Sequence, residues 1–573
     1  MSEPLGEPAP TAAPSYGPAA AMTGGKALVR ALAVHGTRTA FGIPGTHNLE
    51  IYRHLDRYGI AHVTPRHEQG AGYAADAYAR VSGRAGVAIT TTGPALLNIA
   101  AAVGQAHSDS VPLLVVSPGM PLRHPRLPTG LLHEMRGQSE AMRGVAAFSH
   151  RVSSVEEIGA AVARAFVLFD TERPRPAHIE IPLDLLEAAE PVGQTQLRPP
   201  SVPRAPHSAM IDQAVQALRA ARRPVLVLGG GARRAAAYCL ALAEELSAPV
   251  VTTANGKGIV AETHPLSIGV SLHSPSVQRW LADRDVVLAV GTELAESDLW
   301  STGPPVLNGT LIRVDLDPAQ MYAGLQADIP LVADARLALE ALLAGCRERD
   351  DHTVSLPEHD VPEHDVPEHG ASERAGAARV DAVRLRGLRG AETAGRDARW
   401  VPYLHAVRSV LDADAVITSD SAQCCYYGAL PHLPVGPEGR YLHPTGFGTL
   451  GYALPAAVGA KTAAPGRQVV ALSGDGGLQF SVQELATAVR LRLPLPVVVF
   501  DNGGYGEIRD EMAARGDTPV AVDLTPVDLS ALARAYGGRG ERAETPAALA
   551  DALTRALAVS VPTVITVPEE TVR

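Results

Sequence analysis

Residues 471–512 of this 573-residue chain read ALSGDGGLQFSVQELATAVRLRLPLPVVVFDNGGYGEIRDEM. Two apolar runs of strand length, near 468–473 and 496–501, are separated by a stretch with the composition of a helix. Apolar strands that alternate with helices are typical of a parallel sheet covered on both faces. Asp475 follows the first run and Asn502 follows the second. Because ligands bind at the carboxyl ends of parallel strands, we expect both residues at one ligand-binding edge.

The same alternation of apolar runs and helical stretches extends along most of the chain. It predicts an α/β protein with three doubly wound parallel-sheet domains. We expect a disordered tail at 1–21, domains at 22–190, 205–346 and 380–573, and a linker at 350–378. Besides the two runs above, strands are expected near 38–43, 87–92, 111–117, 225–229, 249–254, 285–291, 310–315, 415–419 and 563–567.

Composition and charge argue against several classes of protein. The net charge of −11 argues against nucleic-acid binding, which needs a basic face. No apolar run is long enough to cross a bilayer, and the Pro/Ala-rich N-terminus lacks the features of a secretory signal. Four cysteines without Cys-x-x-Cys spacing fit reduced thiols. We expect a cytoplasmic protein without nucleic-acid or membrane partners.

The expected linker contains a near-perfect five-residue repeat, PEHDVPEHDVPEHG, at 357–370. Three histidines in a short tract are compatible with metal binding. However, each unit contains a proline, which blocks regular structure, and carboxylates that repel one another. We therefore expect a disordered linker.

The segment around Asp475 has the features of a site for a metal-bound phosphate. Glycines on either side allow a close approach to the backbone, and the carboxylate offers hard oxygen ligands. A helix expected to start near Ser481 would direct its N-terminal amides at the same place, which suits an anion. The alternative is a tight turn with an aspartate cap. The second polar strand exit, at Asn502, favours the ligand site.

Gly-Asp-Gly at 474–476, followed by the Asp501–Asn502 pair, resembles the thiamine-diphosphate signature of the decarboxylase and acetohydroxyacid synthase superfamily. The resemblance covers the chain from about residue 22 to 570. It implies that Mg²⁺ is held by the side chains of Asp475 and Asn502 and by the backbone carbonyl of Gly504. Asp501 stands where the family more often has asparagine, but the metal-binding position is kept.

Two further motifs fit the same family. SDSAQCC at 419–425 resembles its diphosphate-holding loop, and TGFGTLGYALPAA at 445–457 resembles the segment beneath the coenzyme. In the second motif, the carbonyl of Gly448 would accept a hydrogen bond from the 4′-amino group. Leu450 would be the wedge that bends the coenzyme, with a core residue as the alternative. The resemblance also implies cofactor contacts from Asn98, Ser421, Ala422, Gln423, Gly474, Gly476, Gly477, Tyr505 and Gly506.

Residues 65–98, PRHEQGAGYAADAYARVSGRAGVAITTTGPALLN, resemble the part of the family that activates the coenzyme. A carboxylate bonded to the pyrimidine in a dry site promotes loss of the C2 proton. The resemblance assigns this role to Glu68, for which a solvated helix-start residue is the alternative. In the family this glutamate and the metal site come from different subunits. A homodimer or homotetramer with active sites at the subunit interface is therefore implied.

Three further side chains are candidates for the substrate pocket. His47 lies on the loop after the first strand, and Gln138 lies on a loop expected to reach the site. Glu507 follows the metal loop, where relatives have an apolar residue. It is either an exposed carboxylate in a first helical turn, favoured by the helix dipole, or a group that binds a guanidinium through paired charge-assisted bonds.

The middle domain offers no clear nucleotide signature. PVLVLGGGARRAAA at 224–237 fails the Gly-x-Gly-x-x-Gly spacing because Arg234 stands at the third glycine position. Flavin-bearing relatives carry an Arg-Phe-Asp-Asp-like segment, whereas AVGTELAESDLW at 289–300 lacks that arginine. We therefore expect no FAD, and we expect thiamine diphosphate with Mg²⁺ as the cofactors.

Taken with GIPGTHNLEIYRHL at 42–55 and LHEMRGQSEAM at 132–142, the motifs resemble 5-guanidino-2-oxopentanoate decarboxylases more closely than acetolactate synthases. This implies a carboxy-lyase that converts a basic 2-oxo acid to an aldehyde and CO₂ without oxidation. The alternative is an acetolactate-synthase-like carboligase that joins decarboxylated pyruvate to a second carbonyl. A non-catalytic paralogue is a third possibility, against which Glu68, Asp475 and Asn502 argue.

Overall fold

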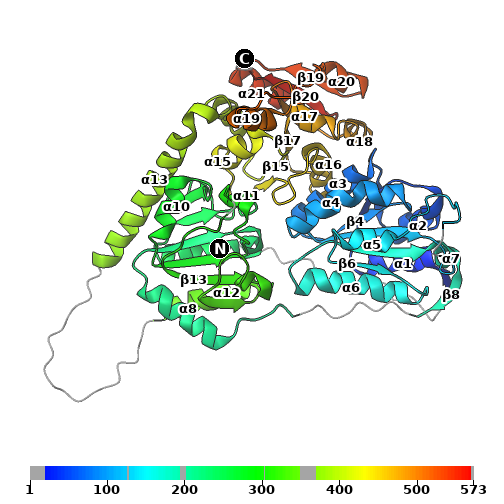
Figure 1. Cartoon of the computed structure of the whole chain (residues 1–573), viewed down its shortest axis with the longest axis horizontal. Coiled ribbons are helices and arrows are strands. Elements are labelled where there is room, and N and C mark those ends of the chain that lie inside the picture. Colours follow the sequence, from blue (N-terminus) through cyan, green and yellow to red (C-terminus); the bar gives the residue numbers. More distant parts are fainter. Residues whose placement is uncertain (1–19, 126–127, 194–201, 302, 349–368, 570–573) are drawn as a thin grey trace, which may run out of the picture.

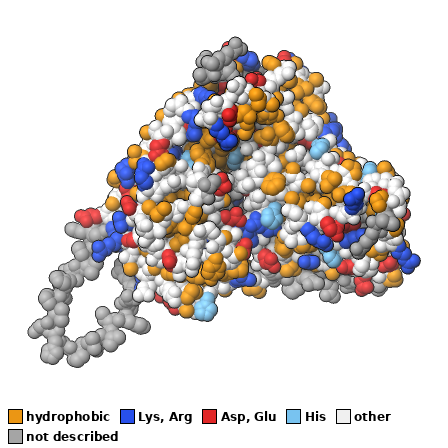
Figure 2. Space-filling view, viewed as in Figure 1, with side chains coloured by type: hydrophobic (Ala, Val, Ile, Leu, Met, Phe, Trp, Pro, Cys, Tyr) orange, Lys and Arg blue, Asp and Glu red, His pale blue; other side chains and the backbone are white. Residues whose placement is uncertain are grey.

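The computed structural model describes residues 20–125, 128–193, 202–301, 303–348 and 369–569. It contains three six-stranded parallel sheets, each covered by helices, which confirms the predicted α/β class with three doubly wound domains (Figure 1). Each strand predicted above is present to within a few residues. Within the described residues, no helix is both long and apolar enough to cross a membrane. Figure 2 shows acidic and basic side chains mixed over the visible face.

The first domain has the strand order β3-β2-β4-β5-β7-β6. Its strands are β2 (Thr39–Gly42), β3 (Ala61–Val63), β4 (Gly86–Ile89), β5 (Leu113–Gly119), β6 (Phe148–Arg151) and β7 (Ala177–Pro182). Its helices are α1 (Gly24–Val34), α2 (Leu49–Leu55), α3 (Glu68–Ser82), α4 (Pro94–Ser108), α5 (Gln138–Arg143), α6 (Glu157–Thr171) and α7 (Leu183–Glu187).

The central domain has the order β11-β10-β9-β12-β13-β14. Its strands are β9 (Pro224–Leu228), β10 (Val250–Thr252), β11 (Ser267–Val270), β12 (Val286–Val290), β13 (Thr310–Asp315) and β14 (Ile329–Val332). Its helices are α8 (Ser208–Ala220), α9 (Ala236–Glu245), α10 (Pro275–Ala282), α11 (Glu296–Leu299) and α12 (Ala335–Arg347). After β9, Gly229 and Gly231 pack against the backbone of Gly291. Because glycine has no side chain, the two turns can approach each other closely here.

The third domain has the order β16-β15-β17-β18-β20-β19, the same topology as the first. Its strands are β15 (Val416–Ser419), β16 (Arg440–Leu442), β17 (Val469–Gly474), β18 (Pro496–Asp501), β19 (Arg539–Arg542) and β20 (Thr563–Pro568). Its helices are α14 (Val401–Val410), η5 (Cys424–Ala429), α15 (Leu430–His432), α16 (Ala453–Ala463), α17 (Asp475–Gln479), α18 (Glu484–Arg490), α19 (Gly506–Ala514), α20 (Leu529–Ala535) and α21 (Pro546–Leu557).

Regular structure extends into two segments that were predicted to lack it. Strand β1 (Ala20–Thr23) starts inside the predicted tail and pairs with β8 (Ala189–Val192) in an antiparallel ribbon. Helix α13 (His369–Asp397) starts inside the predicted linker, because the repeated prolines end at Pro367 and helix-forming residues follow. The repeat up to Glu368 and the tail up to residue 19 lie outside the described residues.

The first and third domains share one hydrophobic core, in which α3 packs closely on α16. A Cβ atom added at Gly459 of α16 would lie 1.9 Å from the carbonyl oxygen of Ala74 in α3. The carboxylate of Glu484 accepts hydrogen bonds from the backbone N–H groups of Arg66 (2.9 Å) and His67 (3.1 Å). The start of α3, where Glu68 lies, is therefore fixed by the third domain.

Candidate functional site

The carboxyl ends of β17 and β18 bring together the residues predicted to bind the metal. The two strands are paired, with Gly474 opposite Phe500. The backbone N–H of Asn502 donates to Asp475 Oδ1 at 3.3 Å, and the N–H of Gly504 donates to Asn502 Oδ1 at 3.2 Å. One carboxylate, one side-chain amide and the backbone of a glycine thus lie side by side, which is an oxygen set suited to Mg²⁺.

The helix predicted to start near Ser481 begins six residues earlier. Helix α17 starts at Asp475 itself, and the next helix, α18, starts only at Glu484. The prediction was wrong because Gly476 and Gly477 are accommodated in the first turn of the helix rather than in a loop before it. Asp475, the predicted metal ligand, therefore lies in the first helical turn.

The glycines of this edge are required by close contacts. A Cβ added at Gly477 would lie 3.0 Å from the carboxylate of Asp420, and one at Gly506 would lie 2.6 Å from Asn502 Nδ2. Gly504 has a φ of +157°, and a Cβ there would lie 2.0 Å from the carbonyl oxygen of Val522. The ring of Tyr505 packs over Gly476. Side chains at these positions would distort the loop that carries the predicted metal residues.

The charge on Asp475 also fits a bound cation. The residue is buried, and burial, together with the nearby charge of Asp501, raises the pKa of its carboxyl to about 6. No cationic side chain of the described residues forms an ion pair with Asp475. A divalent cation would compensate this charge, so the residues present fit a Mg²⁺–diphosphate group.

The loop after β15 contains a buried carboxylate that the sequence analysis missed. Asp420 accepts hydrogen bonds from the N–H groups of Ser421 (2.9 Å) and Gly451 (2.9 Å) and from the Ser473 hydroxyl (3.2 Å). Burial raises the pKa of Asp420 to about 6. The residue joins the predicted diphosphate loop, the end of β17 and the 445–451 loop. Its position at a strand exit is the same signal that identified Asp475.

The loop at 445–451 has the open backbone expected of a segment beneath a ligand. Gly448 has a φ of +63°, and a Cβ there would meet nothing within 4 Å. Leu450 is half-buried rather than a core residue. Phe447 is 51% exposed. The conformation leaves space above Gly448, and the role of Leu450 as a wedge stays a prediction.

Glu68 is the first residue of α3, as predicted, and is half-buried. Its Oε2 accepts a hydrogen bond at 2.9 Å from the side chain of Asn98 on α4. The structure thus joins these two predicted residues to each other. They belong to the first domain, whereas Asp475 and Asn502 belong to the third, and the pairing of Glu68 with a neighbouring subunit stays a prediction.

His47 and Gln138 lie at the corresponding edge of the first sheet. His47 Nδ1 is 2.6 Å from the hydroxyl of Thr92, which is 3.3 Å from His133 Nδ1. Gln138 is buried, donates to the carbonyl of Pro118 (2.6 Å) and accepts from the N–H of Gly93 (3.0 Å). His47 faces a polar cluster, but Gln138 uses its amide to fix the turn after β4.

Glu507 is held by neutral donors that the sequence did not identify. Its carboxylate accepts from the hydroxyls of Tyr427 (2.7 Å) and Tyr426 (3.0 Å) and from the side chain of Gln423 (3.0 Å). The residue is half-buried in the first turn of α19, so the alternative of a freely exposed carboxylate is wrong. Gln423, predicted to contact the diphosphate, also donates to Asp510 at 2.8 Å.

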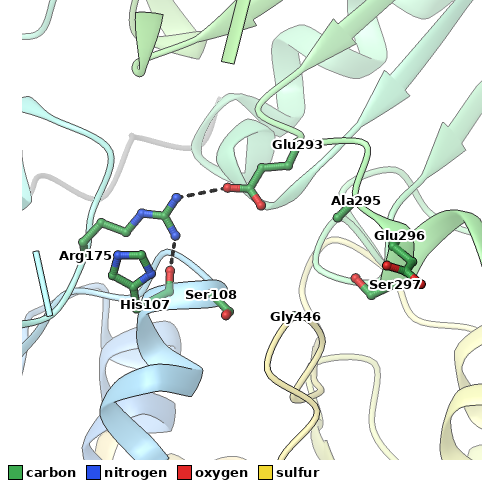
Figure 3. A pocket seen from close by; sticks show the side chains of 8 residues that line it. All are labelled: His107, Ser108, Arg175, Glu293, Ala295, Glu296, Ser297 and Gly446. Carbon is green, nitrogen blue, oxygen red and sulfur yellow. Dashed lines mark hydrogen bonds and ion pairs between the residues drawn. The ribbon is translucent and has the colours of Figure 1, made fainter. Parts of the chain in front are cut away.

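A cavity of about 550 Å³ lies where the three domains meet (Figure 3). His107, Ser108 and Arg175 come from the first domain, and Gly446 comes from the third. The central domain contributes Glu293, Ala295, Glu296 and Ser297. Glu293 forms ion pairs with Arg173 (3.1 Å) and Arg175 (3.0 Å), so its charge is already compensated. The cavity adjoins the 445–451 loop through Gly446.

Comparison with known families agrees with this division of the chain. Residues 22–141 match the family described as "Thiamine pyrophosphate enzyme, N-terminal TPP binding domain". Residues 211–342 match its central domain, and residues 422–567 match its C-terminal TPP binding domain. The two TPP-binding matches contain the two sheet edges described above.

Comparison with individual proteins gives relatives along nearly the whole chain. A probable 2-ketoarginine decarboxylase of Pseudomonas aeruginosa is 42% identical over 523 residues, which cover 91% of this chain and 89% of the relative. Acetolactate synthase isozyme 3 large subunit of Escherichia coli is 30% identical, with 94% of this chain and 92% of the relative covered. The large subunit from Corynebacterium glutamicum is 32% identical, with 88% and 79% covered. With three matching domains and relatives of this similarity, the chain belongs to the thiamine-pyrophosphate-dependent enzymes.

Proposed function

We propose that the protein is a Mg²⁺-dependent, non-oxidative decarboxylase of a basic 2-oxo acid. The proposed substrate is 5-guanidino-2-oxopentanoate, or 2-ketoarginine, and the proposed products are CO₂ and 4-guanidinobutanal. Similarity to a probable 2-ketoarginine decarboxylase supports the substrate class. The observation that carries the assignment is the carboxylate of Glu507, which lies next to the predicted metal loop and has no cationic partner among the described residues.

Thiamine diphosphate, when bound, supplies the nucleophilic carbon and the electron sink for loss of CO₂ from a 2-oxo acid. Asp475, Asn502 and Gly504 would hold the Mg²⁺ that the diphosphate requires. Glu68 would hold a proton at the N1′ atom of the aminopyrimidine, with Asn98 fixing the orientation of its carboxylate. His47, whose ring is linked to the Thr92 hydroxyl, would orient the 2-oxo acid from the first domain.

Glu507 suits a guanidinium better than the other acidic groups near the site. Three neutral donors orient its carboxylate without cancelling its charge. A guanidinium would add charge-assisted hydrogen bonds, which are about twice as strong as neutral ones. Glu293, in the cavity between the domains, already has two arginine partners and offers less to an incoming cation. We therefore assign recognition of the cationic end to Glu507.

We further propose that the active site is completed by a second copy of the chain. Asn98 and its neighbour Leu97 are exposed on α4, and Leu97 is 51% exposed although it is apolar. Phe447 in the 445–451 loop is exposed to the same degree. Exposed apolar residues beside predicted catalytic groups are typical of a surface that is buried on association. A homodimer, or a homotetramer built from it, would cover them.

An assay of product type tests the proposal. The purified protein is incubated with thiamine diphosphate, Mg²⁺ and either 5-guanidino-2-oxopentanoate or pyruvate. We expect equal amounts of CO₂ and 4-guanidinobutanal from the basic acid and little turnover of pyruvate. A 2-hydroxy-3-oxo acid formed from pyruvate at a comparable rate would instead identify a carboligase of the acetolactate synthase type.

A further inference from the structure

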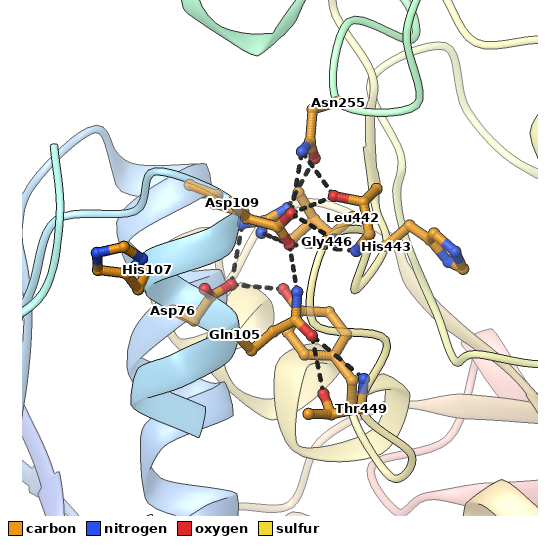
Figure 4. A network of polar contacts seen from close by, with 12 residues as sticks. Asp76, Gln105, His107, Asp109, Asn255, Leu442, His443, Gly446 and Thr449 are labelled. Carbon is orange, nitrogen blue, oxygen red and sulfur yellow. Dashed lines mark hydrogen bonds and ion pairs between the residues drawn. The ribbon is translucent and has the colours of Figure 1, made fainter. Parts of the chain in front are cut away.

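Helix α4 has polar contacts at both of its ends. Near its start, Asn98 is bonded to Glu68. At its other end, Gln105 and Asp109 lie one helical turn apart, and Gln105 Nε2 donates to Asp109 Oδ2 at 2.7 Å. Both side chains point from the first domain toward the third, as Figure 4 shows. Neither residue belongs to a motif of the coenzyme site.

Gln105 and Asp109 hold the two ends of one short segment. The hydroxyl of Thr445 donates to Asp109 Oδ1, and the N–H of Gly446 lies 3.4 Å from the same oxygen. Four residues later, the hydroxyl of Thr449 (3.0 Å) and its N–H (3.3 Å) donate to Gln105 Oε1. Gly448, whose open backbone is predicted to lie beneath the aminopyrimidine, lies between these two sets of contacts in the chain.

The contacts to Asp109 are made by an ionised group. The carboxylate is buried, which would raise its pKa, but the charge of Arg80 and the donated hydrogen bonds hold that pKa below its usual value. Arg80 lies 2.6 Å from Asp109 and also pairs with Asp76 at 3.0 Å. Asn255 of the central domain donates to Asp109 at 3.2 Å. The segment is therefore attached to a junction of all three domains.

A segment with a left-handed glycine needs such attachments to keep one conformation. Gly448 has no neighbour that a Cβ would meet, so its surroundings do not restrict it. Glycine also loses more conformational freedom on ordering than other residues do. The order of the segment consequently depends on the contacts of Thr445 and Thr449, among which are those to Asp109 and Gln105 at the end of α4.

We propose that Gln105 and Asp109 are positioning residues, which hold the 445–449 segment in the conformation that receives the aminopyrimidine of the coenzyme. The inference rests on the assignment of thiamine diphosphate, but it does not depend on which 2-oxo acid is the substrate. Removal of either contact should loosen the segment and weaken coenzyme binding without unfolding the domains.

Two variants each remove the side-chain contacts at one end of the segment and leave the buried ion pairs in place. Gln105→Met keeps the length of the side chain but loses its bonds to Thr449 and Asp109. Thr445→Val loses the hydroxyl that donates to Asp109 and accepts from Asn255. The matched control is Thr445→Ser, which keeps the hydroxyl. Loss of a charge-assisted hydrogen bond corresponds to a change of about 10- to 100-fold in an equilibrium constant. We expect thiamine diphosphate, titrated with saturating Mg²⁺ into the coenzyme-free proteins, to bind about 10-fold or more weakly to both variants and normally to the control.

Hydrogen exchange of the coenzyme-free proteins separates this role from a merely structural one. Amide exchange at 445–449 should become about 10-fold faster in both variants, while exchange in β15 and β17 stays unchanged. Faster exchange with unchanged coenzyme affinity would overturn the proposal, and so would unchanged exchange. If one variant fails to fold, the other decides by the same two measurements. If the unmodified protein does not bind thiamine diphosphate, the coenzyme assignment and this proposal fail together, whereas failure in the variants alone overturns only the positioning role.

Discussion

The hydroxyl of Tyr427 donates to the carboxylate of Glu507 across 2.7 Å, although the two residues lie 80 positions apart in the chain. Tyr426, the preceding residue, donates to the other carboxylate oxygen at 3.0 Å. The π-helical turn that contains both tyrosines thus fixes a negative charge beside the predicted metal loop. This arrangement is the physical basis for expecting a cationic substrate.

Glu507→Gln should reduce the affinity for basic 2-oxo acids selectively. The amide keeps the size of the side chain but loses the charge that a guanidinium would meet. A hydrogen bond to a charged group contributes about 1.5–3 kcal/mol, so KM for 5-guanidino-2-oxopentanoate should rise about 10- to 100-fold. Steady-state kinetics with uncharged 2-oxohexanoate should show little change. The matched control is Asp510→Asn, an exposed carboxylate on the same helix. Equal KM values for the basic acid in the variant and the parent would refute the recognition role.

Asp475→Asn should weaken Mg²⁺ binding. Burial and the nearby charge of Asp501 raise the pKa of this carboxyl, and a bound divalent cation would offset that penalty. We expect the Mg²⁺ concentration for half-maximal coenzyme binding to rise at least about 10-fold. Asp501→Asn, which changes the neighbouring carboxylate outside the predicted ligand set, should have a smaller effect. Equal changes in the two variants would mean that the site responds to total charge and not to a specific ligand.

Asp298 should make the stability of the protein fall as the pH rises. Burial raises its pKa to about 7, above the usual value of 3.8, so the folded state binds the proton more tightly than the unfolded state. The stabilisation is fully present below pH 4 and is lost progressively up to about pH 7, by at most about 1.4 kcal/mol per pH unit. Asp298→Asn keeps the acceptor for the Ala254 N–H and should remove this slope. From pH 4 to pH 8, the thermal unfolding midpoint of the variant should therefore rise relative to that of the parent protein. A difference between the two midpoints that does not change with pH would show that Asp298 does not titrate in this range.

Gly459→Ala should destabilise the contact between the first and third domains. Its methyl group would lie 1.9 Å from the carbonyl oxygen of Ala74, so α3 and α16 would have to move apart. Overpacking of this kind costs about 1–3 kcal/mol. Thermal unfolding should occur at a lower temperature than in Gly466→Ala, where the added methyl group meets nothing within 4 Å. Identical midpoints would show that the two helices can separate freely.

The sequence predicted the fold because its strands are buried on both faces. Runs such as Val469–Gly474 and Pro496–Asp501 are apolar over most of their length, and their number and spacing identify three parallel sheets. Edge strands such as β6 (Phe148–Arg151) and β19 (Arg539–Arg542) were missed, since they are short and partly polar. The start of α13 was missed because the predicted linker extended about ten residues beyond the end of the proline repeat.

The strand pattern made the candidate site predictable where its residues follow strands directly. Asp475 and Asn502 meet because the ends of adjacent parallel strands must meet. Other contacts join residues that lie tens or hundreds of positions apart, such as those of Gln105, Asp109 and Tyr427. No local sequence pattern indicates such hydrogen bonds.

The most direct test of the account is the effect of Glu68→Gln on thiamine-diphosphate-dependent release of CO₂ from 5-guanidino-2-oxopentanoate. The amide cannot hold the proton at the aminopyrimidine, and loss of a positioned acid–base group lowers rates by about 10²- to 10⁴-fold. We predict a fall in kcat of that size, with CO₂ and 4-guanidinobutanal as the products of the parent protein. Undiminished CO₂ release in the variant would contradict the account.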